Sequence, residues 1–115
     1  MMLTQKIEKN YNDKYRVAYK YYSVLLLLND IHLSNKEIEL LSFIAVNGTI
    51  SNVTARRDFQ ELYKTDSQAT INNTVSKLKK MNLLIKRDNK IRIADKLKFD
   101  FSDGFLLKLK CNVGA

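Results

Sequence analysis

The 115-residue chain contains no proline, no tryptophan, three glycines, one cysteine and one histidine. Without proline-rich or glycine-rich stretches, the sequence has no flexible linker and no low-complexity segment. The single cysteine, Cys111, excludes an internal disulfide and a cysteine-rich zinc site, and we expect it to be a small buried side chain. Three scattered glycines cannot form a glycine-rich phosphate-binding loop. These absences remove several classes of enzyme and metalloprotein.

Long apolar runs are also lacking. The longest, Val24 to Leu28, has five residues, far fewer than the ~20 that span a bilayer. The first ten residues lack the apolar core of a secretory signal, so we expect an intracellular protein that is not secreted and has no membrane partner. With 45% apolar and 28% charged residues, the composition is globular, and the length predicts one domain over residues 1–115.

The net charge of +8 is concentrated in the second half of the chain. Residues 67–115 contain eleven Lys and Arg against four Asp and Glu, whereas residues 1–66 are nearly balanced. Most of the excess lies between Lys77 and Lys98. A clustered excess of this kind indicates a polyanionic or acidic partner, and an ordinary solvated basic face is the alternative.

Apolar periodicity predicts a long N-terminal helix over residues 4–29. Its tyrosines and its leucine-rich end make it apolar on more than one side, which favours burial against a neighbouring protein. Packing onto the chain's own core is the alternative. The residues of this helix predicted to contact another protein are Tyr11, Tyr15, Tyr22 and Leu25.

Three shorter helices follow. Ser34 and Glu37 form a capping box that begins the first, and Asn47-Gly48 ends it. The next covers about residues 52–64, and the last, capped by Ser67, covers residues 68–81. The residues expected to be buried on the middle helix are Val53, Phe59 and Leu62.

Two hairpins are predicted after these helices. In the first, short strands around Ile85 and Ile91–Ile93 flank the turn residues Asp88-Asn89. The second covers residues 95–115, where apolar and polar residues alternate on both sides of a turn at residues 102–104. Because a lone hairpin is marginal in water, its apolar face needs a partner surface. The residues predicted to make that contact are Phe99, Phe101, Leu107 and Leu109.

This order of elements is that of a winged helix-turn-helix domain. Residues 69–87, ATINNTVSKLKKMNLLIKR, resemble the recognition helix and first wing strand of MarR-type regulators, with Val75 and Leu78 as the core pair. Asn82 stands where that family usually has glycine, and asparagine tolerates the same left-handed backbone. The resemblance implies an α+β, mainly α fold. It has a winged-helix core over residues 33–94, an extra long N-terminal helix and an added C-terminal β-hairpin.

The resemblance also indicates a contact surface. With Ile71, Val75 and Leu78 facing inward, the opposite side of helix 68–81 carries polar and basic side chains. Asparagine and glutamine can bond base edges in a major groove, and lysine and arginine can contact phosphates or an acidic protein. The predicted contact residues are Gln68, Thr70, Asn72, Asn73, Ser76, Lys77, Lys80, Lys86, Arg87, Lys90 and Arg92.

A second resemblance covers most of the chain. The segments NDKYRVAYKYY (12–22), KEIELLSF (36–43) and TINN (70–73) are similar to small winged-helix proteins of tailed phages, notably the crAss-like group. The resemblance implies a structural subunit of the ring or connector between capsid and tail, found in the virion or the host cytoplasm. Its partners would be other protein subunits, identical or different, with double-stranded DNA near the basic face.

Two functional hypotheses therefore stand. The favoured one is a non-enzymatic structural subunit of a phage particle, and the alternative is a MarR-type transcriptional regulator that reads the major groove with helix 68–81. An enzyme is not expected, because His32, the only histidine, has no cysteine or suitably spaced acid pair nearby. No cofactor, metal ion or small-molecule substrate is expected.

Overall fold

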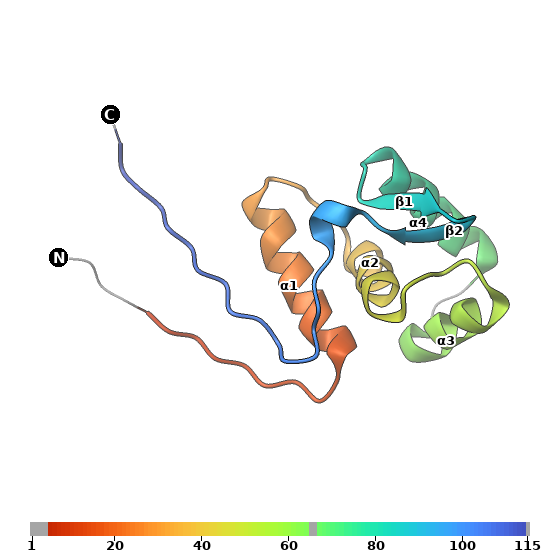
Figure 1. The fold of residues 1–115 in the computed structure, drawn as a ribbon, viewed down its shortest axis with the longest axis horizontal. Helices are drawn as coiled ribbons and strands as arrows, with labels where there is room; N and C mark the ends of the chain where they lie inside the picture. Colours follow the sequence, from red (N-terminus) through yellow and green to blue (C-terminus); the bar gives the residue numbers. More distant parts are fainter. Residues whose placement is uncertain (1–4, 65–66, 115) are drawn as a thin grey trace.

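The computed structural model describes residues 5–64 and 67–114 (Figure 1). In this part of the chain, helices and one antiparallel two-stranded sheet make an α+β, mainly helical protein. The elements are α1 (Lys14–Leu28), α2 (Asn35–Asn47), α3 (Val53–Tyr63), α4 (Gln68–Lys80), β1 (Leu84–Arg87), β2 (Lys90–Ile93) and a 3₁₀ turn (Asp95–Leu97). None of the described helices is long and apolar enough to cross a membrane.

Helix α1 is shorter than predicted. It begins at Lys14, because Asp13 has an extended backbone and its carboxylate accepts a hydrogen bond from the Arg16 backbone N–H at 2.9 Å. Residues 5–13 contain no helix, so the prediction of a helix from residue 4 was wrong over this stretch, and Thr4 itself lies outside the described residues. Asn10, Asn12 and Asp13 explain the late start, since such residues favour caps and turns over helix interiors.

The tyrosines of α1 pack mainly within the chain. Ala18 and Tyr22 are fully buried, and Tyr15 stacks on Phe43 of α2 with ring centroids 5.5 Å apart. The buried Tyr22 hydroxyl donates a hydrogen bond to the Leu97 carbonyl at 2.7 Å, which ties the chain after β2 to α1. Tyr22 was therefore wrongly predicted as a contact for another protein. The alternative prediction, that this helix packs onto the chain's own core, is confirmed for this side of α1.

This hydrogen bond gives a test of the packing between α1 and the chain after β2. Tyr22→Phe should lower the free energy of unfolding by about 1–2 kcal/mol, because the buried Leu97 carbonyl loses its donor. Tyr21→Phe is the matched control, since its hydroxyl forms no hydrogen bond with any described residue; it should change stability by less than about 0.5 kcal/mol. Urea unfolding measures both. Equal losses in the two variants would show that the Tyr22 hydroxyl contributes nothing.

Helix α2 lies in the middle of the molecule, between α1 on one side and α3 and α4 on the other (Figure 1). The predicted capping box is confirmed: the Glu37 N–H donates to Ser34 Oγ at 3.2 Å, and the Ser34 N–H donates to Glu37 Oε1 at 2.8 Å. Gly48 ends the helix with φ +100°, a left-handed backbone that suits glycine. The buried side chains of α2, including Leu41, form the centre of the core.

Helix α3 buries a different stripe from the one predicted. Phe59 is buried as expected, but Val53 is 82% exposed and Leu62 is also exposed. The buried positions are Ala55 and Phe59, four residues apart, with Tyr63 packed against the same core. Val53 lies in the first turn on another side of the helix, where none of the described elements covers it.

The first hairpin is confirmed. Strands β1 and β2 pair antiparallel from Leu84 opposite Ile93 to Arg87 opposite Lys90. Asp88 and Asn89 both adopt positive φ, 53° and 63°, as the tight two-residue turn requires.

The second predicted hairpin is wrong for the described residues, because 98–114 contain no strand. Phe101 is buried against Tyr22, with ring centroids 5.7 Å apart, and a turn at Ser102-Asp103 follows. Residues 105–114, here called the C-terminal arm, then run out from the body as an extended segment (Figure 1). Residues 5–13, the N-terminal arm, also run out on that side. Cys111 is exposed on the C-terminal arm, not buried as expected.

Candidate nucleic-acid and protein interfaces

Helix α4 has one buried and one exposed side, as predicted. Ile71, Val75 and Leu78 are buried, and Ser67 caps the helix by accepting a hydrogen bond from the Thr70 N–H at 3.2 Å. The polar residues predicted to face outward are exposed: Asn72, Asn73, Ser76, Lys77 and Lys80. The side of α4 that faces away from the core can therefore meet a partner.

Several of the predicted contact residues already have partners in the chain. Lys77 forms an ion pair with Glu37 of the α2 capping box. The Gln68 side-chain oxygen accepts a hydrogen bond from Arg56 at 2.7 Å, and the hydroxyl of Thr70 lies 3.0 Å from that of Ser67. These contacts position the start of α4 against α3 and the last turn of α4 against α2. The side chains of Asn72, Asn73, Ser76 and Lys80 have no such contact among the described residues.

The Glu37–Lys77 pair makes stability depend on pH. Burial alone raises the pKa of Glu37, but hydrogen bonds from Lys77 and from Ser34 outweigh it and hold the pKa below its usual value. A carboxylate whose folded pKa is lowered stabilises the fold above the unfolded value, ~4.3, and this contribution is lost as the pH falls through the folded pKa.

We therefore expect Lys77→Met to reduce the loss of stability between about pH 6 and pH 3. Lys79→Met is the matched control, because Lys79 is exposed on the same helix without an ion-pair partner among the described residues. Urea unfolding at both pH values gives the comparison. An identical pH dependence in wild type and in both variants would contradict the assigned role of this pair.

Of the predicted contact residues on the hairpin, some are free to meet a partner and others already have one within the chain. Lys86 and Lys90 are exposed. Arg87 instead forms a bidentate ion pair with Asp95, with N–O distances of 3.1 and 2.8 Å. Hydrogen bonding to Arg87 lowers the pKa of Asp95 below its usual value. Lys80, Lys86 and Lys90 are thus the exposed cations of the predicted surface that form no ion pair with another described residue.

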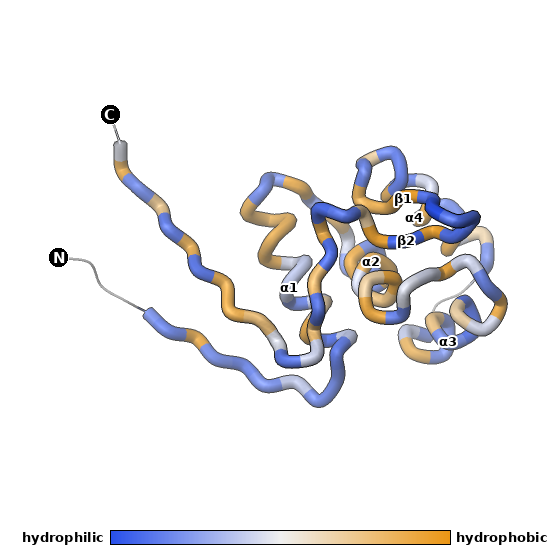
Figure 2. Tube along the Cα trace, viewed as in Figure 1, coloured by the Kyte–Doolittle hydropathy of each residue, from blue (hydrophilic) through white to orange (hydrophobic). Residues whose placement is uncertain are grey.

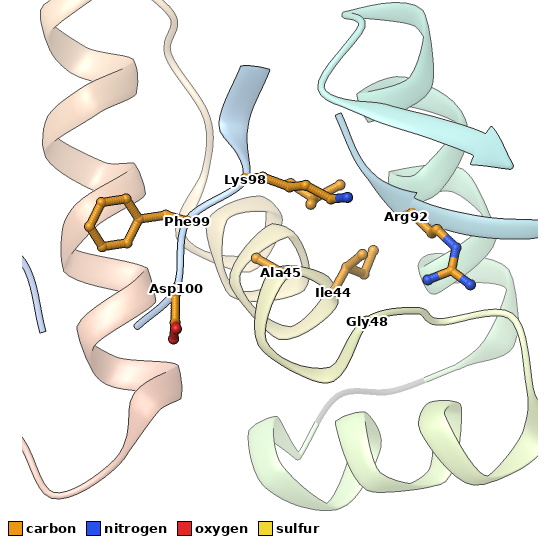
Figure 3. Close-up of a pocket in the computed structure, with 8 residues that line it drawn as sticks. Ile44, Ala45, Gly48, Arg92, Lys98, Phe99 and Asp100 are labelled. Carbon is orange, nitrogen blue, oxygen red and sulfur yellow. The ribbon is translucent and has the colours of Figure 1, made fainter. Parts of the chain in front are cut away.

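Arg92 lies in a cavity instead. The cavity, about 420 Å³, lies between the end of α2, β2 and residues 98–100 (Figure 3). Ile44 and Ala45 line its apolar side, and the Arg92 and Lys98 side chains extend beside them. The Nε atom of Arg92 is buried without a hydrogen-bond partner among the described residues. Arg92 is therefore half-buried, and not a fully exposed cation of the hairpin.

The residues predicted to contact other proteins are only partly exposed. Tyr22 and Phe101 are buried in the chain's own core, so their assignment was wrong. Half-buried positions are found for Tyr11, Tyr15, Leu25 and Leu107. Phe99 stacks on Tyr21 with ring centroids 4.9 Å apart, and Leu109 is exposed. The sequence reasoning missed three strongly exposed apolar residues of the two arms: Ile7, Leu106 and Val113.

A second cavity, about 360 Å³, lies at the start of α1 and is here called the tyrosine cleft. Its lining residues are Tyr11, Tyr15, Arg16, Tyr19, Lys20, Glu39 and Tyr63. Burial raises the pKa of Tyr63, and the nearby carboxylate of Glu39 raises it further. The regular spacing of Tyr11, Tyr15 and Tyr19 can be read from the sequence. Their contact with residues of α2 and α3 cannot, because it depends on how the helices pack.

No protein-family model, no curated protein and no solved structure matches this chain. Among the described residues, no group of three or more His, Cys, Asp or Glu side chains is placed to bind a metal ion. The surfaces themselves, together with the resemblances given above, are therefore the basis for the function proposed below.

Proposed function

We propose that this protein is a non-enzymatic structural subunit of a multi-protein assembly. In this proposal residues 33–94 form a winged helix-turn-helix body, and the two arms make the contacts with other subunits. The single observation that carries the proposal is the C-terminal arm, which is extended and uncovered in the isolated chain.

The composition of the arms supports protein contacts. Leu106 is 93% exposed and Leu109 is 61% exposed, and apolar and polar residues alternate along the C-terminal arm from Leu107 to Val113 (Figure 2). On the N-terminal arm, Ile7 is 76% exposed. Burying a leucine side chain stabilises a complex by ~1.5–3 kcal/mol, so an exposed apolar segment of this kind favours association. Extended segments with alternating side chains are also suited to bind along a neighbouring surface.

The finer proposal is a subunit of a tailed-phage particle, in the ring or connector region between capsid and tail. It is based on the resemblance of segments 12–22, 36–43 and 70–73 to small winged-helix proteins of crAss-like phages. The excess of positive charge in residues 67–115 supports a position close to DNA or to an acidic neighbouring subunit.

Light scattering of the full chain, with and without duplex DNA, tests this proposal. A structural subunit should form rings or larger oligomers, or aggregate without its partner, whether or not DNA is present. A clean monomer or simple dimer that binds one duplex sequence with nanomolar affinity would contradict it.

DNA binding by a MarR-type regulator is the second candidate. The exposed polar side of α4 supports it, since Asn72 and Asn73 carry the amides that can bond adenine edges. Lys80, Lys86 and Lys90 are placed on α4 and the hairpin as exposed cations.

For that candidate, Lys80→Ala should weaken binding to every duplex sequence and lower the salt slope by about one. Asn72→Ala should instead relax sequence preference, with a cost of about 1–3 kcal/mol on the preferred site. Fluorescence anisotropy with two duplexes at several salt concentrations separates the two effects. Absent or salt-independent duplex binding would exclude this candidate.

A further inference from the structure

The tyrosine cleft combines aromatic rings with a carboxylate. Tyr15, Tyr19 and Tyr63 come from two helices, and Glu39 of α2 lines the same cavity in a half-buried position. No described residue forms a hydrogen bond or a close ion pair with the Glu39 carboxylate. Burial raises the pKa of Glu39, although Lys36 acts in the opposite direction. Tyrosine faces and a carboxylate together favour an organic cation, such as a lysine ammonium.

Other charged groups also line the cleft or lie near its tyrosines. Arg16 pairs with Asp13, with Nε 3.9 Å from Oδ2, and Lys20 is exposed. Asp13 and Asp58 add negative charge, because both raise the pKa of Tyr15 after the larger effect of burial. Arg16 and Asp13 neutralise one another, so the carboxylates of Glu39 and Asp58 remain as negative charge near the rings, and Lys20 remains as the cation of the lining that forms no ion pair with a described residue.

The C-terminal arm carries the matching chemistry. Residues 105–114 contain Lys108 and Lys110 and no acidic residue. Because side chains alternate along an extended segment, Leu106, Lys108 and Lys110 share one side of the arm. This side presents one large apolar group followed by two cations, which suits a cleft of tyrosine rings and a carboxylate.

The arm of a chain and the cleft of the same chain lie on opposite sides of α1. Tyr21 contacts Phe105 at the root of the arm, with ring centroids 5.1 Å apart, whereas Tyr19 lines the cleft. Two residues along an α-helix correspond to a rotation of about 200°. An arm would have to cross α1 to reach its own cleft, so the occupant is more readily supplied by a second copy.

We propose that the tyrosine cleft of one copy binds the Leu106–Lys110 side of the C-terminal arm of the next copy. The contact joins two different surfaces, so it is head-to-tail, and repetition closes a ring or extends a filament. This inference rests on the proposed function and adds to it the identity of the partner and the site. Glu39 receives the lysine ammonium groups, and the rings of Tyr15 and Tyr19 cover their alkyl stems and Leu106.

A charge exchange in the full chain tests the contact. In sedimentation velocity, the double variant Lys108→Glu/Lys110→Glu should weaken self-association at least about tenfold, and Glu39→Lys should do the same. Combining the three substitutions should restore most of the association, because the charges again match. Lys6→Glu/Lys9→Glu is the matched control: it makes the same change of charge on the N-terminal arm and should have little effect.

A cysteine cross-link locates the contact. Cys111 is the single cysteine and is exposed on the arm, and Lys20 is exposed at the edge of the cleft. On mild oxidation with diamide, Lys20→Cys should give a ladder of disulfide-linked multimers, as a head-to-tail contact requires. Lys86→Cys, at a position on β1 that is also exposed, should give no ladder.

The outcomes separate this inference from the proposed function. Oligomers that persist unchanged in both charge variants would overturn the cleft contact and leave the proposed assembly role standing. A cross-link within one chain, or an equal ladder from Lys86→Cys, would also overturn the contact. A wild-type chain that stays monomeric at about 100 μM would overturn the self-contact, while assembly with a different subunit would still be measurable by light scattering of the mixture.

Discussion

Leu106→Ser/Leu109→Ser should weaken self-association of the full chain by about ten- to a hundredfold without reducing its stability to urea. Both leucines are mainly exposed in the isolated chain, so replacing them removes no contact of the folded body. Leu106 lies on the side of the arm that enters the cleft and Leu109 on the opposite side, so the loss comes mainly from Leu106. Losing the burial of one leucine costs ~1.5–3 kcal/mol, which corresponds to about a ten- to hundredfold change in the association constant. Sedimentation velocity over a range of concentrations measures the change.

Leu27→Ser/Leu28→Ser provides the matched control for this experiment. These two leucines are also exposed, but they lie at the end of α1, away from both arms (Figure 1). We expect nearly wild-type association from this variant. Equal weakening by the two double variants would indicate a general effect of exposed leucine and would contradict a specific role of the C-terminal arm.

Leu78→Ala should lower the free energy of unfolding by about 3 kcal/mol. Leu78 is fully buried where α4 packs on the core formed by α2, and truncating a buried leucine costs ~2–5 kcal/mol through lost burial and the cavity that remains. For a domain with a total stability of ~5–15 kcal/mol, this is a large fraction. Both proposed roles of α4 need this anchor, because it holds the polar side outward.

Lys79→Ala is the control for Leu78→Ala, since Lys79 is the next residue and is exposed. Alanine is a good helix former, so this variant should change stability by less than about 0.5 kcal/mol. Urea unfolding followed by circular dichroism gives both values. A loss below about 1 kcal/mol for Leu78→Ala would show that α4 is not anchored by this side chain.

Local signals made much of the fold predictable. The capping box at Ser34 and Glu37, the cap at Ser67 and the turn at Asp88-Asn89 each depend on residues within a few positions, and each is observed. The buried stripe of α4 followed from the helical period alone. Such features need no knowledge of the rest of the chain.

The C-terminal arm shows where sequence patterns fail. Alternation of apolar and polar residues predicts an extended backbone, but it does not show whether a neighbouring strand is available for pairing. Residues 105–114 are extended as the pattern requires and lie apart from any strand. The predicted hairpin was wrong because its apolar side finds no partner among residues 5–64 and 67–114, except near Phe99, Phe101 and Phe105, which pack on Tyr21.

The candidate sites were predictable only in part, for a related reason. The outward residues of α4 follow from one helix, but their ion pairs depend on distant residues, as Lys77 pairs with Glu37 forty positions earlier. The tyrosine cleft needs α1, α2 and α3 to meet, because Glu39 and Tyr63 complete it. Contacts between elements decide such sites, and a periodic pattern within one element does not contain them.

Amide hydrogen exchange at increasing protein concentration tests most directly whether the C-terminal arm becomes covered by another subunit. We expect amides of residues 105–114 to exchange rapidly in dilute protein and to become protected as the concentration rises, while amides of α2 are protected throughout. Amides of residues 105–114 that exchange rapidly at every concentration, with oligomers present, would contradict the assignment of this arm as the assembly contact.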